Sequence, residues 1–233
     1  NQPLISKEAK KNVSESLKAG WLSSAGPFVK KFENDFAKLF GVKHAITVTN
    51  GTAALHIALL SLGIRKGDEV IVPSFTMAST WVAVLYTGAT PIFVDCELET
   101  YNIDPNKIEE KITSKTKAII PVHIYGHACE MDTVMAIAKK HNIYVIEDAA
   151  EAIGGTYKGK KCGAIGDVGC FSFYANKIIT TGEGGMVITN NDNLAEEARK
   201  FKDLYHSPQK RFIHEKIGYN YRMTNLQAAV GCG

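Results

Sequence analysis

Short apolar segments alternate with helix-like spacings from residue 45 to residue 148, and this alternation constrains the fold more than any other feature. The apolar runs predict strands at residues 45–49, 69–72, 91–94, 118–122 and 144–148. Strands that alternate with helices form an α/β fold, with a mostly parallel sheet covered by helices on both faces. A ligand of such a sheet lies beyond the carboxyl ends of the strands.

Helical spacing and capping residues predict helices at residues 7–19, 27–39, 50–62, 79–86, 104–112, 131–141 and 192–204, with another starting at Thr224. Ser6 and Asp192 are the expected N-caps of the first helix and of the helix at 192–204. An aromatic stripe on the second helix predicts core packing through Phe28, Phe32, Phe36 and Leu39. A last strand is expected at residues 186–189.

The domain organisation predicted from these elements is an N-terminal helix and arm at residues 1–26, followed by one large domain at residues 27–233. Residues 206–222 form a polar and aromatic stretch that we expect to be a loop. The chain ends inside the helical pattern that Thr224 begins, which favours a fragment of a longer protein.

The composition narrows the classes of function. The chain has 233 residues, of which 45% are hydrophobic, and this suffices for a sizeable core. Its formal net charge of +3 is too small to favour nucleic acid or a membrane surface. No apolar run has membrane-spanning length, and no signal peptide is expected. Five cysteines without a C-x-x-C pair are typical of reduced thiols in a cytoplasmic protein. His123 and His127 are separated by a predicted turn, so we expect no metal site there.

One lysine stands out for its surroundings. Phe171, Phe173 and Tyr174 precede Lys177, and a glycine-rich turn follows at residues 182–185. Aromatic neighbours can desolvate an amine, and a desolvated lysine can attack an aldehyde to form a Schiff base. Taken alone, the pattern favours a solvated lysine after a strand, since most lysines lie on the surface, and only the other motifs of the chain reverse this preference.

Asn50, Gly51 and Thr52 open a helix directly after a strand. Free N–H groups at a helix start suit a phosphate, Gly51 permits close backbone approach, and Thr52 adds a hydroxyl. An ordinary N-cap would have the same sequence.

Three further polar residues extend this pattern. Asp148 ends an apolar strand, where a buried carboxylate needs a cationic partner such as a protonated pyridine nitrogen. Glu151 follows three residues later and could reach the same ligand, while Ser172 could meet the phosphate held by Gly51 and Thr52. A pyridine ring with a phosphate at one end and an aldehyde at the other satisfies all these groups. That ligand is pyridoxal 5′-phosphate (PLP).

Motifs along nearly the whole chain resemble the sugar-nucleotide aminotransferases of the DegT/DnrJ/EryC1/StrS family. The resemblance lies in residues 21–24, 50–55, 72–76, 88–91, 121–126, 147–151, 182–185, 219–224 and 227–229. Asn176-Lys177, followed by residues 180–185, is most similar to the GDP-perosamine synthase subgroup, which aminates C4 of a 4-keto-6-deoxy sugar.

This resemblance implies a fold-type-I aminotransferase that takes its amino group from L-glutamate. It further implies a homodimer with active sites at the subunit interface, a sugar-nucleotide substrate, and a small C-terminal domain that this chain lacks. The implied site residues are Lys177 for the Schiff base, Asp148 for the pyridine nitrogen, Glu151 for the ring hydroxyl, Ser172 and Thr52 for the phosphate, and Asn220 for the partner's cofactor.

Two positions depart from the pattern of many relatives. Met77 stands where many have an aromatic residue that stacks on the cofactor, although a thioether can also contact a ring. Glu151 replaces a common Gln and is similar to the C4 aminotransferases. Trp81, one helical turn after Met77, is expected in the core.

Three alternatives remain from the sequence. Dehydratases of the family carry His in place of the lysine, and Lys177 speaks against that activity. An aminotransferase acting at C3 of a 3-keto sugar nucleotide fits the same residues. A PLP-binding regulator without turnover is disfavoured by the intact set of Lys177, Asp148 and Ser172.

Overall fold

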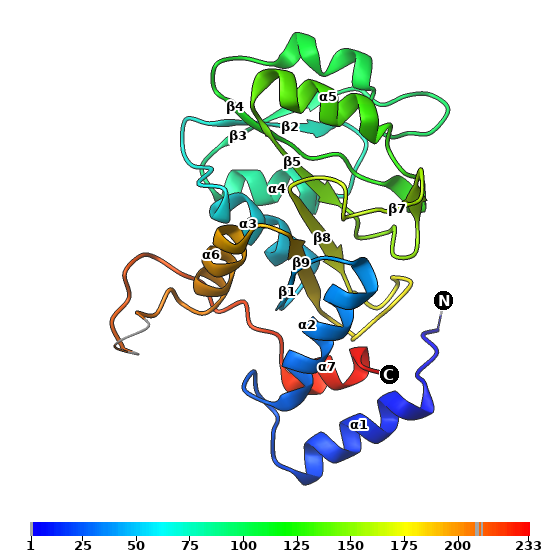
Figure 1. The fold of residues 1–233 in the computed structure, drawn as a ribbon, viewed down its shortest axis with the longest axis vertical. Coiled ribbons are helices and arrows are strands. Elements are labelled where there is room, and N and C mark those ends of the chain that lie inside the picture. Colours follow the sequence, from blue (N-terminus) through cyan, green and yellow to red (C-terminus); the bar gives the residue numbers. More distant parts are fainter. Residues whose placement is uncertain (1, 208–209, 211) are drawn as a thin grey trace.

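A seven-stranded sheet forms the centre of the computed structural model, which describes residues 2–207, 210 and 212–233 (Figure 1). Across the sheet the strand order is β1-β9-β8-β5-β4-β2-β3. The strands are β1 (His44–Val48), β2 (Glu69–Pro73), β3 (Thr90–Val94), β4 (Thr116–Ile119), β5 (Tyr144–Asp148), β8 (Val168–Ser172) and β9 (Gly185–Thr189). A separate small hairpin consists of β6 (Thr156–Tyr157) and β7 (Lys160–Lys161).

The pairing confirms the predicted, mostly parallel sheet. Strands β3, β2, β4, β5 and β8 pair in parallel, whereas β9 lies antiparallel between β1 and β8. The predicted strands lie within a few residues of the observed ones. Strand β8 is the strand that was expected before Lys177, for which the sequence pattern set no bounds.

Helices cover both faces of the sheet, as expected. One face packs against α3 (Gly51–Ser61), α4 (Ala78–Tyr86) and α6 (Asp192–Lys202). The other packs against α2 (Pro27–Phe40) and α7 (Asn225–Gly231) near β1, and against α5 (Met131–His141) near β4. Alternate residues of β2 illustrate the two layers, because Val70 and Val72 face the first core and Ile71 faces the other.

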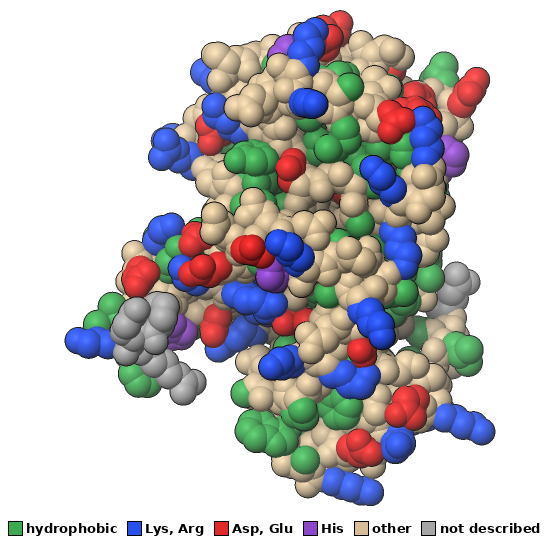
Figure 2. Space-filling model, in the orientation of Figure 1, with side chains coloured by type: hydrophobic (Ala, Val, Ile, Leu, Met, Phe, Trp, Pro, Cys, Tyr) green, Lys and Arg blue, Asp and Glu red, His purple; other side chains and the backbone are tan. Residues whose placement is uncertain are grey.

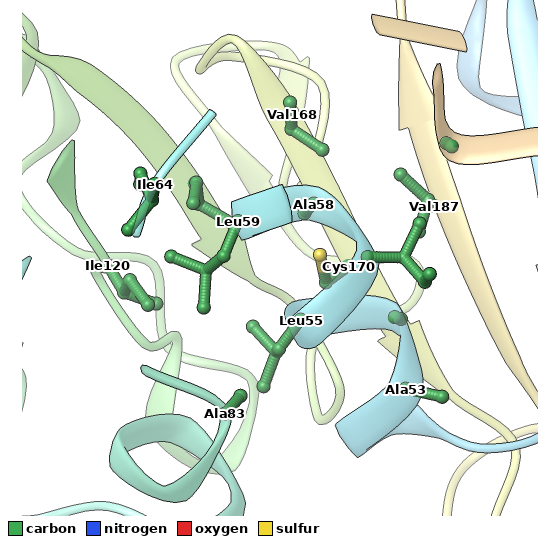
Figure 3. Packing of buried hydrophobic residues seen from close by; sticks show 14 of the residues in the cluster. Ala53, Leu55, Ala58, Leu59, Ile64, Ala83, Ile120, Val168, Cys170 and Val187 are labelled. Carbon is green, nitrogen blue, oxygen red and sulfur yellow. The ribbon is translucent and has the colours of Figure 1, made fainter. Parts of the chain in front are cut away.

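Helix α3 is the most buried helix of the first layer. Its residues 53–59 are all buried, and Leu55 and Leu59 lie between β5, β8 and α4 in Figure 3. A helix that is apolar on every side is stable only inside a core. This burial fixes the start of α3, and therefore Gly51 and Thr52, relative to the strands.

The aromatic stripe of α2 was predicted only in part. Phe32, Phe36 and Phe40 are buried, and the rings of Phe36 and Phe171 lie 5.1 Å apart. Leu39 is instead 50% exposed, so its assignment to the core is wrong. Steps of four residues keep one helix face, and Phe40 continues the line from Phe32 and Phe36.

Two other local predictions need correction. Residues 104–112 form two short 3-10 turns, Pro105–Lys107 and Glu109–Lys111, and not one helix, although Asp104 caps the first turn as predicted. At α6 the N-cap is Asn191, whose side chain accepts the N–H groups of Asn193 and Leu194. Asp192 is the first helical residue, and its carboxylate pairs with His44 at 2.7 Å.

A charged cluster ties α2 to α6 and β1. Glu33 accepts hydrogen bonds from Lys202 at 3.0 Å, Arg199 at 2.8 Å, and the backbone N–H of Thr47 at 2.9 Å. Burial alone would raise the pKa of Glu33, but Lys202 and Arg199 outweigh it and lower that pKa. The cluster therefore holds an ionised carboxylate inside the protein.

Helix α1 (Lys7–Lys18), with Ser6 as its N-cap as predicted, lies beside α7 at one end of the molecule (Figure 1). The buried Asn225, at the start of α7, joins the N-terminal segment to the rest of the chain. Its Nδ2 donates to Ser16 Oγ at 2.7 Å and to the Trp21 carbonyl at 2.9 Å, and its Oδ1 accepts the N–H of Phe28 at 2.8 Å. The division at residue 26 remains a prediction.

The surface shows no strong charge bias on the face drawn in Figure 2, where acidic and basic side chains are interspersed. Among the residues that the structure describes, no helix is both long and apolar enough to cross a membrane.

Candidate active site

A cavity of about 630 Å³ lies beyond the carboxyl ends of β1, β2, β4, β5 and β8. It is lined by every predicted site residue except Asn220, namely Gly51, Thr52, Met77, Asp148, Glu151, Ser172 and Lys177. These residues come from segments far apart in the sequence. They meet because the carboxyl ends of parallel strands share one edge of the sheet.

The start of α3 forms one wall of the cavity. Asn50 caps the helix by accepting the N–H of Ala53 at 2.8 Å. The helix start offers backbone N–H groups and the positive end of the helix dipole, which favour an anion. A Cβ added to Gly51 would lie 2.8 Å from Ser172 Cβ, so glycine is what lets α3 begin directly against the end of β8.

Asp148 is a buried acid at the end of β5, with 5% of its surface exposed. Thr80 donates a hydrogen bond to its Oδ2 at 2.9 Å, and the N–H of Ala150 donates to its Oδ1 at 3.2 Å. Burial raises the pKa of Asp148, and these two hydrogen bonds only partly offset that effect. Both donors are neutral, so the site suits a cationic group that would stabilise the ionised carboxylate.

Lys177 points its amine at Glu151. Its Nζ lies 3.1 Å from Glu151 Oε1, and the Lys177 side chain is 14% exposed. Glu151 Oε2 accepts the backbone N–H of Tyr125 at 2.9 Å. Tyr125 has a positive φ of 50°, a strained conformation for a bulky residue. The carboxylate therefore connects the lysine to a strained turn at the cavity rim.

Met77 and Asn220 complete the predicted set. Met77 is the N-cap of α4, is 64% exposed and lines the cavity, so its thioether is accessible to a ligand. Asn220 lies outside the cavity lining, and its Oδ1 accepts hydrogen bonds from Arg222 Nη2 at 2.8 Å and Nε at 3.1 Å. Arg222 is held in turn by Asp203 at 2.7 Å.

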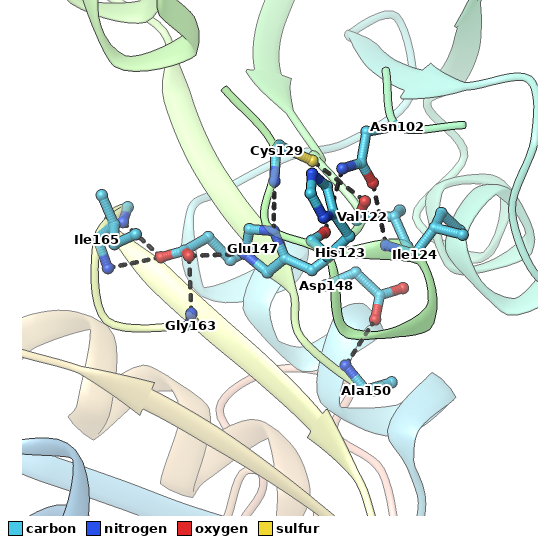
Figure 4. A network of polar contacts seen from close by, with 12 residues as sticks. Asn102, Val122, His123, Ile124, Cys129, Glu147, Asp148, Ala150, Gly163 and Ile165 are labelled. Carbon is cyan, nitrogen blue, oxygen red and sulfur yellow. Dashed lines mark hydrogen bonds and ion pairs between the residues drawn. The ribbon is translucent and has the colours of Figure 1, made fainter. Parts of the chain in front are cut away.

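A buried polar network behind Asp148 was missed by the sequence reasoning (Figure 4). Glu147 and His123 are fully buried, and His123 Nε2 lies 2.9 Å from Glu147 Oε2. His123 Nδ1 accepts the N–H of Cys129 at 3.2 Å, so the ring proton is on Nε2 and is donated to Glu147.

Glu147 also accepts the backbone N–H groups of Gly163, Ile165 and Gly166 at 2.6–2.7 Å. The network thus fixes the turn before β8. The only sequence signal for it was an acid inside an apolar strand. His127 is exposed and takes no part, and the described residues contain no group of three or more potential metal ligands.

Comparison with known proteins decides the family. Residues 3–233 match the DegT/DnrJ/EryC1/StrS aminotransferase family. The chain belongs to this family. A relative named GDP-perosamine synthase, from Escherichia coli O157:H7, is 52% identical over 230 residues, covering 99% of this chain and 63% of that protein.

Two further relatives are similar to this chain, one in sequence and one in both sequence and fold. EpsN of Bacillus subtilis, provisionally named a pyridoxal phosphate-dependent aminotransferase, is 39% identical over 98% of this chain and 61% of its own length. The solved aminotransferase of Psychrobacter cryohalolentis superposes with a TM-score of 0.93 at 43% identity, covering 99% of this chain and 62% of that one. The chain therefore spans about three fifths of the length of these relatives. The described residues have the fold of the solved aminotransferase. The family and the name of EpsN point to PLP as the cofactor.

Proposed function

We propose that this chain carries the cofactor site of a PLP-dependent aminotransferase. The enzyme would move an amino group from L-glutamate to C4 of a nucleotide-linked 4-keto-6-deoxyhexose. The observation that carries the proposal is the meeting of Lys177, Asp148 and the Gly51–Ser172 contact in one cavity. The relative named GDP-perosamine synthase, at 52% identity, favours C4 over C3 as the carbon aminated.

The residues present fit PLP. The start of α3, Thr52 and Ser172 would hold its phosphate, and the absence of a side chain on Gly51 keeps that corner open. Asp148 would bind the protonated ring nitrogen, which supplies the positive charge that a buried carboxylate needs. Glu151 and Met77 would contact the ring from the remaining sides.

When bound, PLP supplies an aldehyde that can carry an amino group and a ring that can accept electron density. Lys177 Nζ would take the proton from the α-carbon of the amino donor and later return a proton to the acceptor sugar. Glu151, 3.1 Å from Nζ, would hold the lysine amine in place. Asp148 would keep the ring nitrogen protonated.

The test is a visible absorption spectrum of the protein at its full natural length, mixed with PLP and then with L-glutamate. We expect a cofactor band that glutamate converts, and formation of an amino sugar when a GDP-linked 4-keto-6-deoxyhexose is added. Lys177→Ala should lose turnover, whereas Lys117→Ala, at an exposed lysine, should keep it. A band that glutamate leaves unchanged would contradict the aminotransferase proposal, and product aminated at C3 would contradict the regiochemistry.

We also propose a homodimer in which Asn220 reaches the partner's cofactor. Support comes from its exposed position outside its own cavity and from its fixation by Arg222. Mixing Lys177→Ala with Asn220→Ala subunits tests this, because half of the dimers are then mixed and each carries one intact site. About a quarter of the native activity should return in a two-fold dimer. No recovery would contradict the shared site.

A further inference from the structure

A chain of two hydroxyl groups runs from the cavity wall to Asp148. Thr76 lies in the turn after β2 and lines the cavity, and Thr80 is fully buried on the first turn of α4. The two Oγ1 atoms lie 2.8 Å apart, and Thr80 Oγ1 lies 2.9 Å from Asp148 Oδ2. Sequence patterns do not reveal this contact, because Thr80 and Asp148 are 68 residues apart.

Each hydroxyl has one proton, which sets the direction of the chain. An ionised carboxylate can only accept, so Thr80 donates to Asp148 and must itself accept from Thr76. The hydrogen bond that Thr80 donates to Oδ2 is stronger when the carboxylate is ionised than when it is protonated. The arrangement therefore favours the ionised form and fixes the orientation of Oδ2.

We propose that Thr80 is a positioning residue for the reaction, which acts through Asp148. It holds the carboxylate in the orientation and the charge state that bind a protonated ring nitrogen, and Thr76 supports it as the second donor. This inference rests on the proposed function, because it is the cofactor ring that needs an ionised Asp148.

Several groups around Asp148 also affect its pKa. Burial raises the pKa of Asp148, and after it the Thr80 hydrogen bond is the largest opposing effect, followed by the Ala150 N–H and the charge of Lys177. On the neighbouring strand β8, the buried Cys170 thiol also faces this region. The buried Glu147, next to Asp148 on β5, points to the opposite face of the sheet, where its carboxylate bonds to His123. Removing one donor should therefore shift the balance measurably towards the protonated acid.

The experiment compares Thr80→Val, which keeps the shape but loses the hydroxyl, with Thr80→Ser, which keeps the hydroxyl. The carboxyl carbon of Asp148 is titrated by ¹³C NMR in protein prepared without cofactor. A hydrogen bond to a charged group predicts an upward pKa shift of about one unit or more in Thr80→Val, and a near-native value in Thr80→Ser. The dissociation constant for PLP, measured by absorbance, should rise about tenfold in Thr80→Val and stay near the native value in Thr80→Ser.

Two further variants serve as a control and as a second test. Thr87→Val removes a hydroxyl from the other end of α4, where Thr87 bonds only to the backbone nearby, and should leave the Asp148 titration unchanged. Thr76→Val removes only the second donor and should give a smaller shift in the same direction, which keeps the test possible if Thr80→Val does not fold.

An Asp148 titration that is the same in native protein, Thr80→Val and Thr76→Val would overturn the inference. Failure of the native protein to bind PLP would instead contradict the proposed function, and the NMR shift would still decide whether Thr80 controls the ionisation of Asp148.

Discussion

Gly51→Ala tests the close contact on which the phosphate corner depends. In an ordinary helix alanine is more stable than glycine by roughly 0.5–1 kcal/mol. Here the new Cβ would lie 2.8 Å from Ser172 Cβ and 3.1 Å from Ser172 Oγ, whereas carbon atoms normally approach to about 3.5–4.0 Å. Ser172 Cβ cannot rotate away because it is fixed to the backbone at the end of β8. The start of α3 or the end of β8 must therefore move by roughly 1 Å.

The expected cost of this overpacking is about 1–3 kcal/mol of unfolding free energy. For a domain of this size that lowers Tm by about 2–12 °C. Calorimetry of the cofactor-free protein measures the loss, and a PLP titration should show weaker binding, since the α3 start no longer lies against Ser172. A fall in Tm indicates overpacking against Ser172, and its size measures how far the two elements resist moving apart.

A double-mutant cycle supplies the control. Ser172→Gly removes the Cβ that Gly51→Ala would strike, so the double variant should be more stable than the sum of the single effects by about 1 kcal/mol. A Gly51→Ala protein with an unchanged or higher Tm would refute the close-contact argument, because the ordinary helix preference would then have prevailed.

Three other changes probe the interior. Glu33→Gln should lower the free energy of unfolding, measured in urea at pH 7, by about 3 kcal/mol, because it leaves Lys202 buried without its carboxylate. The pKa of Glu33 is lower in the folded than in the unfolded protein, where it lies near 4.5. The stability difference between native and variant is therefore complete above pH 4.5 and shrinks as the pH falls through the folded pKa. Glu147→Gln should cost about 3–5 kcal/mol, whereas Glu110→Gln, at an exposed acid, should cost less than about 1 kcal/mol in the same denaturation. Asn225→Ala should loosen α1, seen as faster tryptic cleavage in the first 26 residues with the rest of the chain intact, and equal cleavage rates would argue against Asn225 as the anchor.

The order and type of the main elements were predictable because their signals are local. Parallel strands buried on both faces are continuous apolar runs, and caps such as Ser6 and Thr224 mark helix starts directly. The wrong details, at Leu39 and Asp192, came from choices between adjacent residues. The buried face of α2 depends on Phe171, which is distant in sequence, whereas at α6 both Asn191 and Asp192 are good cap residues and the hydrogen bonds of Asn191 decide between them.

The candidate site was predictable in its residue types and its place in the fold. The strand-end rule placed Asp148, Lys177 and the Gly51 turn at one edge without any contact information, and the cavity contains all three. Sequence reasoning missed Thr80, because a threonine in a helix carries no signal of its partner. It also missed the partnership of His123 with Glu147.

The sequence alone determined the α/β class and the family, and it supplied the candidate site residues, since these depend on periodicity and on motifs that are contiguous in the chain. Only the tertiary structure decided which groups touch, namely Ser172 with Gly51, Glu151 with Lys177 and Thr80 with Asp148. The reason is that each contact depends on the separation of two elements to within about 1 Å. That separation is set by how the whole core packs and not by the residues on either side of the contact.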